Sequence, residues 1–335
     1  MNSSDFGYPM NLHAYATRGI IWSQRQIFAK LLRRFSIHSP MPIDYVGQDA
    51  NDAIRTMINS GMPCLVARFG CVELDAILRG WDIRRKGSVL KKSLGLLTGS
   101  FGPFWWDNSI KAGLLRTAGV FPADEKTLMR FSEQALEDSR QLDILGTWNA
   151  RERQLARKFF PAAKAVDLDD LDPFFFKTPW SSALAGKKVL LVHPFVNTIC
   201  NQYARRAELF EDQSVLPDFE LVTYRPATTF LGLSSPYKDW FDALYKMCDD
   251  ISKIDFDIAI LGCGAYGMSI GAFVKRNLHR QAIHLGGVTQ LLFGIKGGRW
   301  DDRPRFNAFY NSSWVRPNES ERPVNFMQHE GGAYW

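Results

Sequence analysis

A glycine-rich turn between two apolar stretches is the part of this sequence best suited to hold a phosphate. Residues 262–267 read Gly-Cys-Gly-Ala-Tyr-Gly; an apolar run (256–261) precedes them, a helical pattern (268–277) follows, and a second apolar run (281–285) comes next. These elements predict one βαβ unit, whose turn offers an anion free backbone N–H groups and the positive end of a helix dipole. The predicted contacts in this turn are Gly262, Gly264, Tyr266 and Gly267.

The unit differs from a dinucleotide-binding site at the end of its second strand. An NAD-type site carries an acidic residue there to bind the ribose hydroxyls, whereas this strand ends His284-Leu285-Gly286. We therefore expect a phosphate or diphosphate on a ligand other than NAD, with His284 beside it. A second interpretation stays open, in which the glycines only allow the strand and the helix to pack closely.

An upstream turn brings a cation and a carboxylate together. Residues 64–69 predict a strand that delivers Arg68 to its end, and Gly70 and Glu73 follow before a helix predicted at 74–78. Arg68 and Glu73 then form either a structural salt bridge or part of a site.

Further polar residues follow other predicted strands. His193 comes directly after an apolar strand at 187–192, a position suited to ligand binding or proton transfer. The competing interpretation is a structural histidine whose hydrogen bonds are all made within the protein core. Gln290, Lys296 and Arg299 lie among glycines after the last strand, where they extend the predicted site with polar contacts and positive charge.

The elements that position these residues alternate between strands and helices. In the second half of the chain, strands are predicted at 187–192, 219–224, 256–261 and 281–285. This alternation predicts an α/β fold with a Rossmann-like, doubly wound, mainly parallel sheet flanked by helices. In the first half, a strand is predicted at 143–148, loops with short helices at 81–110, and helices at 49–59, 124–140 and 150–160.

Three regions follow from this pattern. Residues 1–45 form a predicted N-terminal extension with a basic amphipathic helix at 18–35, residues 46–300 an α/β domain of two lobes, and residues 301–335 a tail without a predicted element. The chain is expected to cross between the lobes near 165–185, where the acidic and aromatic stretch 167–179 is predicted to lie on the surface.

The composition favours a phosphorylated small molecule over nucleic acid as the ligand. The net charge of +6 is mild, and Lys and Arg form no dense clusters alternating with aromatic residues. Five scattered cysteines without metal or redox spacing fit a reducing cytoplasm. We therefore expect a cytoplasmic protein. The helix at 18–35 either docks on the protein's own core or contacts an anionic surface on the inner face of the cytoplasmic membrane.

Two stretches resemble a known family. The segment Ala67-Arg-Phe-Gly-Cys-Val-Glu-Leu74 is similar to the "RFGDGE" segment of the GT-D-fold glycosyltransferases, which act in bacterial polysaccharide and glycoprotein glycosylation. The glycine turn at 262–267 and the strand after it resemble that family's closing pattern. The resemblance covers roughly residues 51–298.

The resemblance implies transfer of a sugar from a nucleotide-diphosphate donor to a glycan or lipid-linked acceptor in surface polysaccharide biosynthesis. The family's DxE motif is associated with the donor and a divalent metal, and only Glu73 survives here because Cys71 takes its first position. Whether Glu73 helps to bind Mg²⁺ or Mn²⁺ is therefore an open question, since a thiol prefers softer metals.

In this interpretation Glu73 is the base that activates the acceptor, and His193 is the second candidate. The expected donor contacts are Arg68, Gly70, Gly262, Gly264, Tyr266, Gly267, His284, Gln290, Lys296 and Arg299. Two alternatives remain. One is another Rossmann-type nucleotide-using enzyme, such as a methyl- or sulfotransferase or an oxidoreductase. The other is a non-catalytic scaffold of a polysaccharide-assembly complex, which the missing aspartate suggests.

Overall fold

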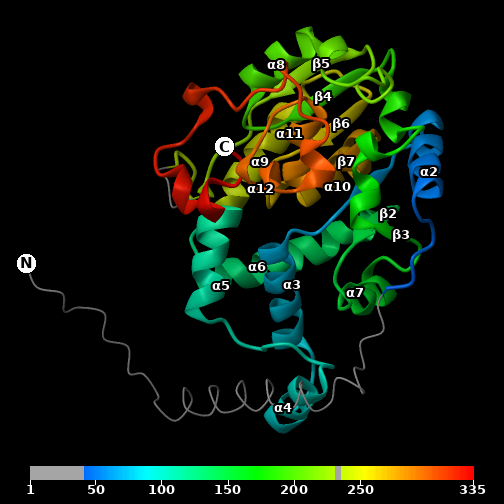
Figure 1. The fold of residues 1–335 in the computed structure, drawn as a ribbon. Helices are drawn as coiled ribbons and strands as arrows, with labels where there is room; N and C mark the ends of the chain where they lie inside the picture. Colours follow the sequence, from blue (N-terminus) through cyan, green and yellow to red (C-terminus); the bar gives the residue numbers. More distant parts are fainter. Residues whose placement is uncertain (1–40, 231–234) are drawn as a thin grey trace, which may run out of the picture.

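A sheet of seven parallel strands organises the residues that the computed structural model describes, 41–230 and 235–335 (Figure 1). Its order is β3-β2-β1-β7-β6-β4-β5. The strands are β1 (Leu65–Ala67), β2 (Ile144–Thr147), β3 (Lys164–Asp167), β4 (Lys188–Val192), β5 (Glu220–Tyr224), β6 (Ile258–Leu261) and β7 (Gln281–His284). The predicted Rossmann-like α/β fold is confirmed, and the pairing of β1 with β7 joins the two halves of the chain.

Helices cover both faces of the sheet (Figure 1). The core of one face includes residues of α3 (Cys71–Arg84), α5 (Asn108–Gly113), α6 (Glu125–Asp138), α7 (Glu152–Phe159), α9 (Trp240–Ser252) and α10 (Tyr266–Leu278). The core of the other includes residues of α2 (Gln48–Asn59), α8 (Val196–Ala204), α11 (Thr289–Leu292), α12 (Gly298–Asp301) and α13 (Pro304–Asn307).

The strands are apolar along their length because both faces are buried. In β1, Leu65 and Ala67 pack into the core that contains α3, whereas Val66 packs into the core that contains α2. Successive strand residues point to opposite faces, so a sheet covered on both sides reads as a continuous apolar run. The five strands predicted after residue 140 therefore agree with the structure to within a few residues.

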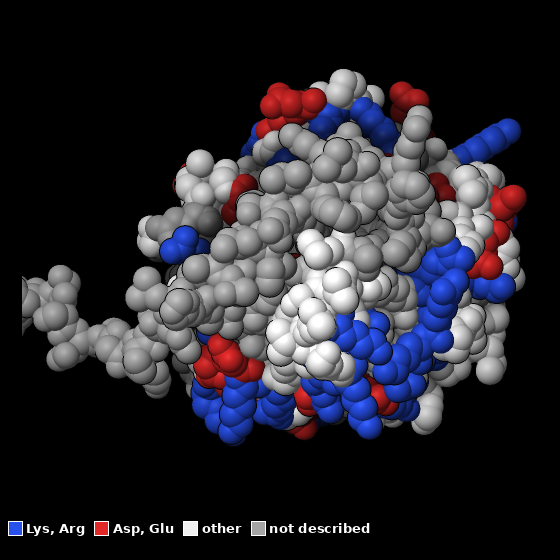
Figure 2. All heavy atoms as spheres, turned by 90° about the horizontal axis from the view of Figure 1, so that it is seen from below, with Lys and Arg blue, Asp and Glu red and all other residues white. Residues whose placement is uncertain are grey.

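Helix α3 begins earlier than predicted. It starts at Cys71 rather than at residue 74, with Gly70 as its N-cap, so Glu73 lies in its first turn. The stretch 81–110 contains short helices, as expected: α4 (Val89–Thr98) and α5. Helix α4 lies at the far end of α3, away from the sheet (Figure 1), on the side that Figure 2 views directly.

The prediction that segment 167–179 lies on the surface is right for Asp167 and Asp169, which are exposed, and wrong for the middle of the segment. Asp170, Asp172 and Phe174 are all buried, and the segment packs beside α2 as two short 3₁₀ turns. The strand that precedes it, β3, was not predicted, because its four residues place only two apolar side chains between charged ends. The Asp170 carboxylate is satisfied by the Gly47 N–H at 2.8 Å, which permits its burial.

The predicted helix at 18–35, and with it the membrane contact predicted there, lies outside the described residues. Within the described ranges, no helix is both long and apolar enough to cross a membrane.

We expect Asn51→Ala to destabilise the fold by about 2–4 kcal/mol, because it leaves two buried backbone groups unsatisfied. Asn51 is fully buried; its Nδ2 donates to the Asp170 carbonyl at 2.9 Å, and its Oδ1 accepts from the Trp180 N–H at 3.0 Å. Denaturant unfolding measures the loss. Asp52→Ala, at the next position of α2 but partly exposed, is the control and should cost about 0.5 kcal/mol or less.

Candidate functional site

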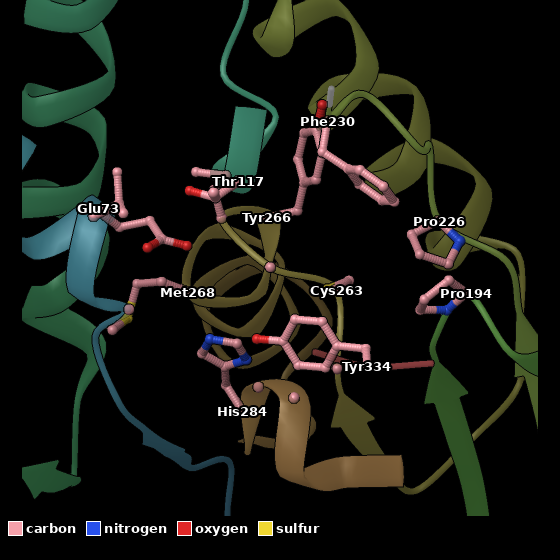
Figure 3. Close-up of a pocket in the computed structure, with 18 of the residues that line it drawn as sticks. Glu73, Thr117, Pro194, Pro226, Phe230, Cys263, Tyr266, Met268, His284 and Tyr334 are labelled. Atoms are coloured by element: carbon pink, nitrogen blue, oxygen red, sulfur yellow. The ribbon is translucent and has the colours of Figure 1, made fainter. Parts of the chain in front are cut away.

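A cavity of about 210 Å³ opens at the carboxyl-terminal edge of the sheet (Figure 3). Turns after β1, β4, β5, β6 and β7 line it, together with parts of α6 and the C-terminal tail. It gathers ten of the twelve residues predicted for the site: Arg68, Gly70, Glu73, His193, Gly262, Gly264, Tyr266, His284, Gln290 and Arg299.

The topology of the sheet explains why the cavity lies there. The helix after β4 (α8) packs on one face and the helix after the neighbouring β6 (α10) packs on the other. The same divergence occurs at β1 and β7, which are followed by α3 and α11. Where helices leave neighbouring strands toward opposite faces, a crevice forms above the strand ends, and open α/β sheets bind ligands at such points.

Arg68 brings an unpaired positive charge to the cavity. Among the described residues, no carboxylate lies within ion-pair distance of it, and its buried Nε has no hydrogen-bond partner. Gly286, with φ +68°, lies beside the guanidinium; a Cβ there would come within 3.1 Å of Nη1. A partly buried cation without a counter-ion favours an anionic ligand.

Two buried carboxyl groups near Arg68 do not offset its charge fully. Burial raises the pKa of Glu152, and it raises the pKa of Asp172 well above its usual range. Both shifts favour the neutral acid. Glu152 is also committed elsewhere, since one carboxylate oxygen accepts the N–H groups of Trp148 and Asn149, each at 3.0 Å.

Glu73 lies in the first turn of α3 and folds back over Gly70. A Cβ on Gly70 would approach a Glu73 carboxylate oxygen to 2.1 Å, so a larger residue would displace the carboxylate. Burial raises the pKa of Glu73, although its own backbone N–H and Arg68 lower it. In Figure 3 this carboxylate faces the same space as His284 and Tyr334. A carboxylate with a raised pKa at a cavity wall suits a general base.

Cys71 does not replace the carboxylate expected by resemblance at the start of α3. Burial and the charges of Glu73 and Asp75 raise the pKa of this thiol, so it stays protonated. Asp75 is engaged by Arg79 at 3.1 Å. In the described part of the chain, no three His, Cys, Asp or Glu side chains gather as a metal site. The side chains present therefore do not fit a divalent metal held by the protein alone.

The glycine turn after β6 combines close packing with open donors. A Cβ on Gly262 would come within 2.5 Å of the His193 ring, and one on Gly267 within 2.2 Å of the His284 ring. Gly264 differs: its φ is +58°, and nothing lies within 4 Å of a Cβ built there. The N–H groups of Gly264 and Ala265 donate to no described residue, so they are available to a ligand in the cavity. Gly262 and Gly267 thus allow close packing, whereas the backbone at Gly264 is open to a ligand, so each of the two interpretations of the glycines applies at different positions.

The helix start after β4 is already occupied. Glu321 from the tail accepts the backbone N–H of Asn197 at 2.7 Å and of Thr198 at 3.1 Å, at the start of α8. Its carboxylate, which is fully buried, also pairs with Arg225 at 3.1 Å. An internal anion therefore neutralises the start of α8, whereas the turn before α10 has no such partner among the described residues.

Two buried histidines line the cavity with opposite hydrogen bonding. His193 Nδ1 accepts the Phe195 N–H at 3.0 Å, whereas His284 Nδ1 lies 3.1 Å from the Leu261 carbonyl and must donate to it. Burial lowers the pKa of His193 to about 3 and that of His284 to about 4, so both are neutral at neutral pH. His193 then carries its proton on Nε2 and offers a donor rather than a base, whereas His284 offers a lone pair on Nε2.

The two remaining predicted cations are engaged elsewhere. Lys296 does not line the cavity; its Nζ lies 5.2 Å from the centre of the Tyr310 ring. Arg299 does line it, but its guanidinium pairs with Glu330 and donates to Tyr334 Oη at 3.0 Å. Arg68 is thus the predicted cation best placed to meet an anion. Gly267 also lies outside the cavity, behind His284.

The predicted contacts Gln290 and Tyr266 are largely structural. Gln290 is fully buried, and its Nε2 donates to the carbonyls of Ile295, Lys296 and Tyr334. Tyr266 stacks on Trp240, with ring centroids 4.9 Å apart, and its hydroxyl lies 2.9 Å from that of Thr229. Both line the cavity, and the Gln290 amide nitrogen and the Tyr266 hydroxyl fix neighbouring segments, whereas the buried Gln290 Oε1 has no hydrogen-bond partner among the described residues.

The C-terminal tail supplies a wall that sequence reasoning missed. Tyr334 and Trp335 line the cavity with His329, whose ring packs 4.6 Å from that of Phe230 after β5. The tail is held to α12, where the Arg299 N–H donates to the Ala333 carbonyl at 2.9 Å. The apolar residues of this tail show no helix or strand periodicity. Its aromatic residues were the one feature of the sequence that could have indicated a role in the cavity.

No protein-family model, curated protein or solved structure matches this chain.

The raised pKa of Glu73 predicts a pH-dependent effect of Glu73→Gln on stability. A carboxyl group that binds its proton more tightly in the folded state lowers stability above that folded-state pKa. We therefore expect the variant to be more stable than wild type at neutral and mildly alkaline pH. The gain should shrink as the pH falls through the raised pKa toward the usual glutamate value. Urea unfolding across this pH range measures it, and exposed Glu211→Gln should show no such trend.

Proposed function

We propose that this chain is a glycosyltransferase that moves a sugar from a nucleotide-diphosphate donor to a hydroxyl group of a glycan or lipid-linked acceptor. One observation carries the proposal: an unpaired Arg68 and a Glu73 with raised pKa occupy the same turn and face the same cavity. Such a transfer needs both a cation for the leaving diphosphate and a base for the incoming hydroxyl. The resemblance of residues 67–74 to the GT-D-fold family supports this reaction class.

The donor diphosphate is expected between Arg68 and the glycine turn. The guanidinium supplies charge from the β1 side, and the N–H groups of Gly264 and Ala265 supply hydrogen bonds from the β6 side. These strands flank β7, so the two contributions face each other across one strand. Donors fixed around a leaving diphosphate stabilise the charge that develops as the glycosyl–oxygen bond breaks.

Aromatic residues offer a surface for the nucleoside. Phe230, His329 and Trp335 lie in ring contact at one side of the cavity. Planar rings of this kind bind a nucleobase by stacking without requiring an acidic partner for the ribose. The absence of a carboxylate at the end of β7, where His284 lies, agrees with a ligand other than NAD.

Glu73 is proposed to activate the acceptor. In a reaction that inverts the anomeric centre, its carboxylate takes the proton of the acceptor hydroxyl as the oxygen attacks the sugar carbon and the diphosphate leaves. His193 is less suited, because its tautomer presents a donor to the cavity. We route no step through a metal, since the side chains present do not fit one.

We expect Arg68→Gln to weaken nucleoside-diphosphate binding about ten- to one-hundredfold, the effect of losing one charged hydrogen bond. Thermal shift with UDP, GDP, CDP and TDP identifies the ligand, and titration calorimetry measures its affinity. Arg157→Gln, an exposed position on α7, is the matched control and should bind like wild type.

Three results would contradict this donor site. Equal affinity of wild type and Arg68→Gln removes Arg68 from it. Stabilisation by NAD(P) or a methyl donor, but by no nucleoside diphosphate, indicates another Rossmann-type enzyme. No nucleotide binding together with a stably bound partner protein indicates a scaffold.

Chelation by EDTA should leave the thermal shift unchanged, because the proposed site contains no metal.

We expect Glu73→Gln to slow sugar transfer about 10²- to 10⁴-fold, the usual contribution of a positioned base. Its affinity for the nucleoside diphosphate should stay within about threefold, since the interaction acts in the transition state. Initial rates with a panel of nucleotide-sugars measure the effect. Transfer that persists undiminished in Glu73→Gln would remove Glu73 from the reaction, and Glu211→Gln should retain full activity.

A further inference from the structure

Helix α4 presents an uncovered apolar edge to solvent. Val89, Leu90 and Leu94 have exposed fractions of 73%, 70% and 55%, and Leu90 and Leu94 lie one helical turn apart. On the inner side of the same helix, Leu96 is buried. The helix is therefore apolar both on the side of Leu96, which the protein covers, and on the side of Leu90 and Leu94, which is exposed.

Two lysines without ion-pair partners among the described residues flank this edge, whereas Arg84 and Arg85 nearby pair with Glu133 and Asp82. From residue 83 to residue 106 the sequence contains five Lys or Arg and no Asp or Glu. Lys86 and Lys91 are exposed, and neither forms an ion pair with a described residue. Figure 2, which views the molecule from the side on which α4 lies, shows a group of uncharged residues bordered by Lys and Arg.

The exposed edge belongs to a fixed element rather than a loose one. Ser88 caps the start of α4 by accepting the Lys91 N–H, and Gly99 ends it in the left-handed conformation. Lys92 ties it to the end of α3 by donating to the carbonyls of Asp82 and Ile83, at 3.0 and 2.7 Å. The apolar side chains are thus held outward.

We propose that the α4 edge, defined as Lys86, Val89, Leu90, Lys91 and Leu94, binds an anionic lipid surface. Aliphatic side chains enter the headgroup region while flanking lysines attract the negative charge of the lipids. A second copy of the chain would be a poorer partner, because Lys86 and Lys91 of both copies, unpaired within the described part of the chain, would meet across the interface.

The orientation of α3 relates this surface to the cavity. Helix α3 carries Glu73 in its first turn and Arg84 in its last, and its 14 residues span about 20 Å. A membrane bound at the α4 edge would hold the cavity at about that distance from the lipid. The inference does not depend on the proposed sugar transfer, since lipid binding is measured without any substrate.

Flotation of the full chain tests the proposal, with vesicles of phosphatidylcholine alone and with added phosphatidylglycerol. We expect wild type to float with the anionic vesicles and to stay unbound with the neutral ones. Leu90→Gln with Leu94→Gln, and separately Lys86→Gln with Lys91→Gln, should each reduce partitioning about tenfold or more. Val46→Gln with Met62→Gln alters two residues that are equally exposed (66% each) on other segments, and it should float like wild type.

Several outcomes would overturn the proposal. Failure of wild type to bind anionic vesicles does so, as does binding of both α4 variants at the wild-type level. Equal binding to neutral vesicles removes the role of charge. Light scattering provides one more test. If wild type is a dimer that does not bind lipid, and the leucine variant is a monomer, the α4 edge is a self-association surface. Thermal unfolding of each variant establishes that it is folded.

Discussion

A parallel sheet must bury both of its faces, and in this chain that requirement determines where a ligand can bind. Helices cover each face, so every crossover returns its turn to one of the two sheet edges, and the carboxyl ends of all seven strands share an edge. Helices that leave neighbouring strands toward opposite faces cannot close over that edge. The cavity therefore follows from topology, and its chemistry depends on the few side chains that the strand ends deliver.

Ion pairs and hydrogen bonds among the described residues leave only a few positively charged or donor groups available to an anionic ligand. In the described chain, three helices of nine or more residues, α3, α8 and α10, begin at the rim. Glu73 lies in the first turn of α3 and Glu321 neutralises the start of α8, whereas the turn before α10 keeps N–H groups that donate to no described residue. Of the three cations considered for a diphosphate, Arg299 is paired and Lys296 lies elsewhere, which leaves Arg68. An anion placed between Arg68 and the glycine turn would satisfy groups that the described protein leaves unsatisfied.

The strands could be predicted because a strand that is buried on both faces consists of a continuous run of apolar residues. The end of each run then indicates which residue reaches the cavity. Arg68, Glu73 and His193 were found in this way. The same logic fails for β3, which is short and charged at both ends, and for the tail, which reaches the cavity through tertiary contacts. Nor can a run of residues show that Lys296 is turned away or that His193 presents a donor, since both depend on neighbours distant in sequence or on one hydrogen bond.

Cys71, at the start of α3, affects the balance of positive and negative charge in the cavity. In the family that residues 67–74 resemble, two carboxylates are associated with a divalent metal and the donor, so negative groups of protein and diphosphate are offset by the metal. Here Cys71 stays a neutral thiol, and the raised pKa of Glu73 weakens its negative charge in the cavity. If a diphosphate binds as proposed, the protein contributes fewer anions there, and one unpaired guanidinium with open N–H groups would offset a larger share of its charge. In the proposed donor site, a cysteine at position 71 and the absence of three grouped metal-ligating side chains among the described residues both assign the neutralising role to Arg68.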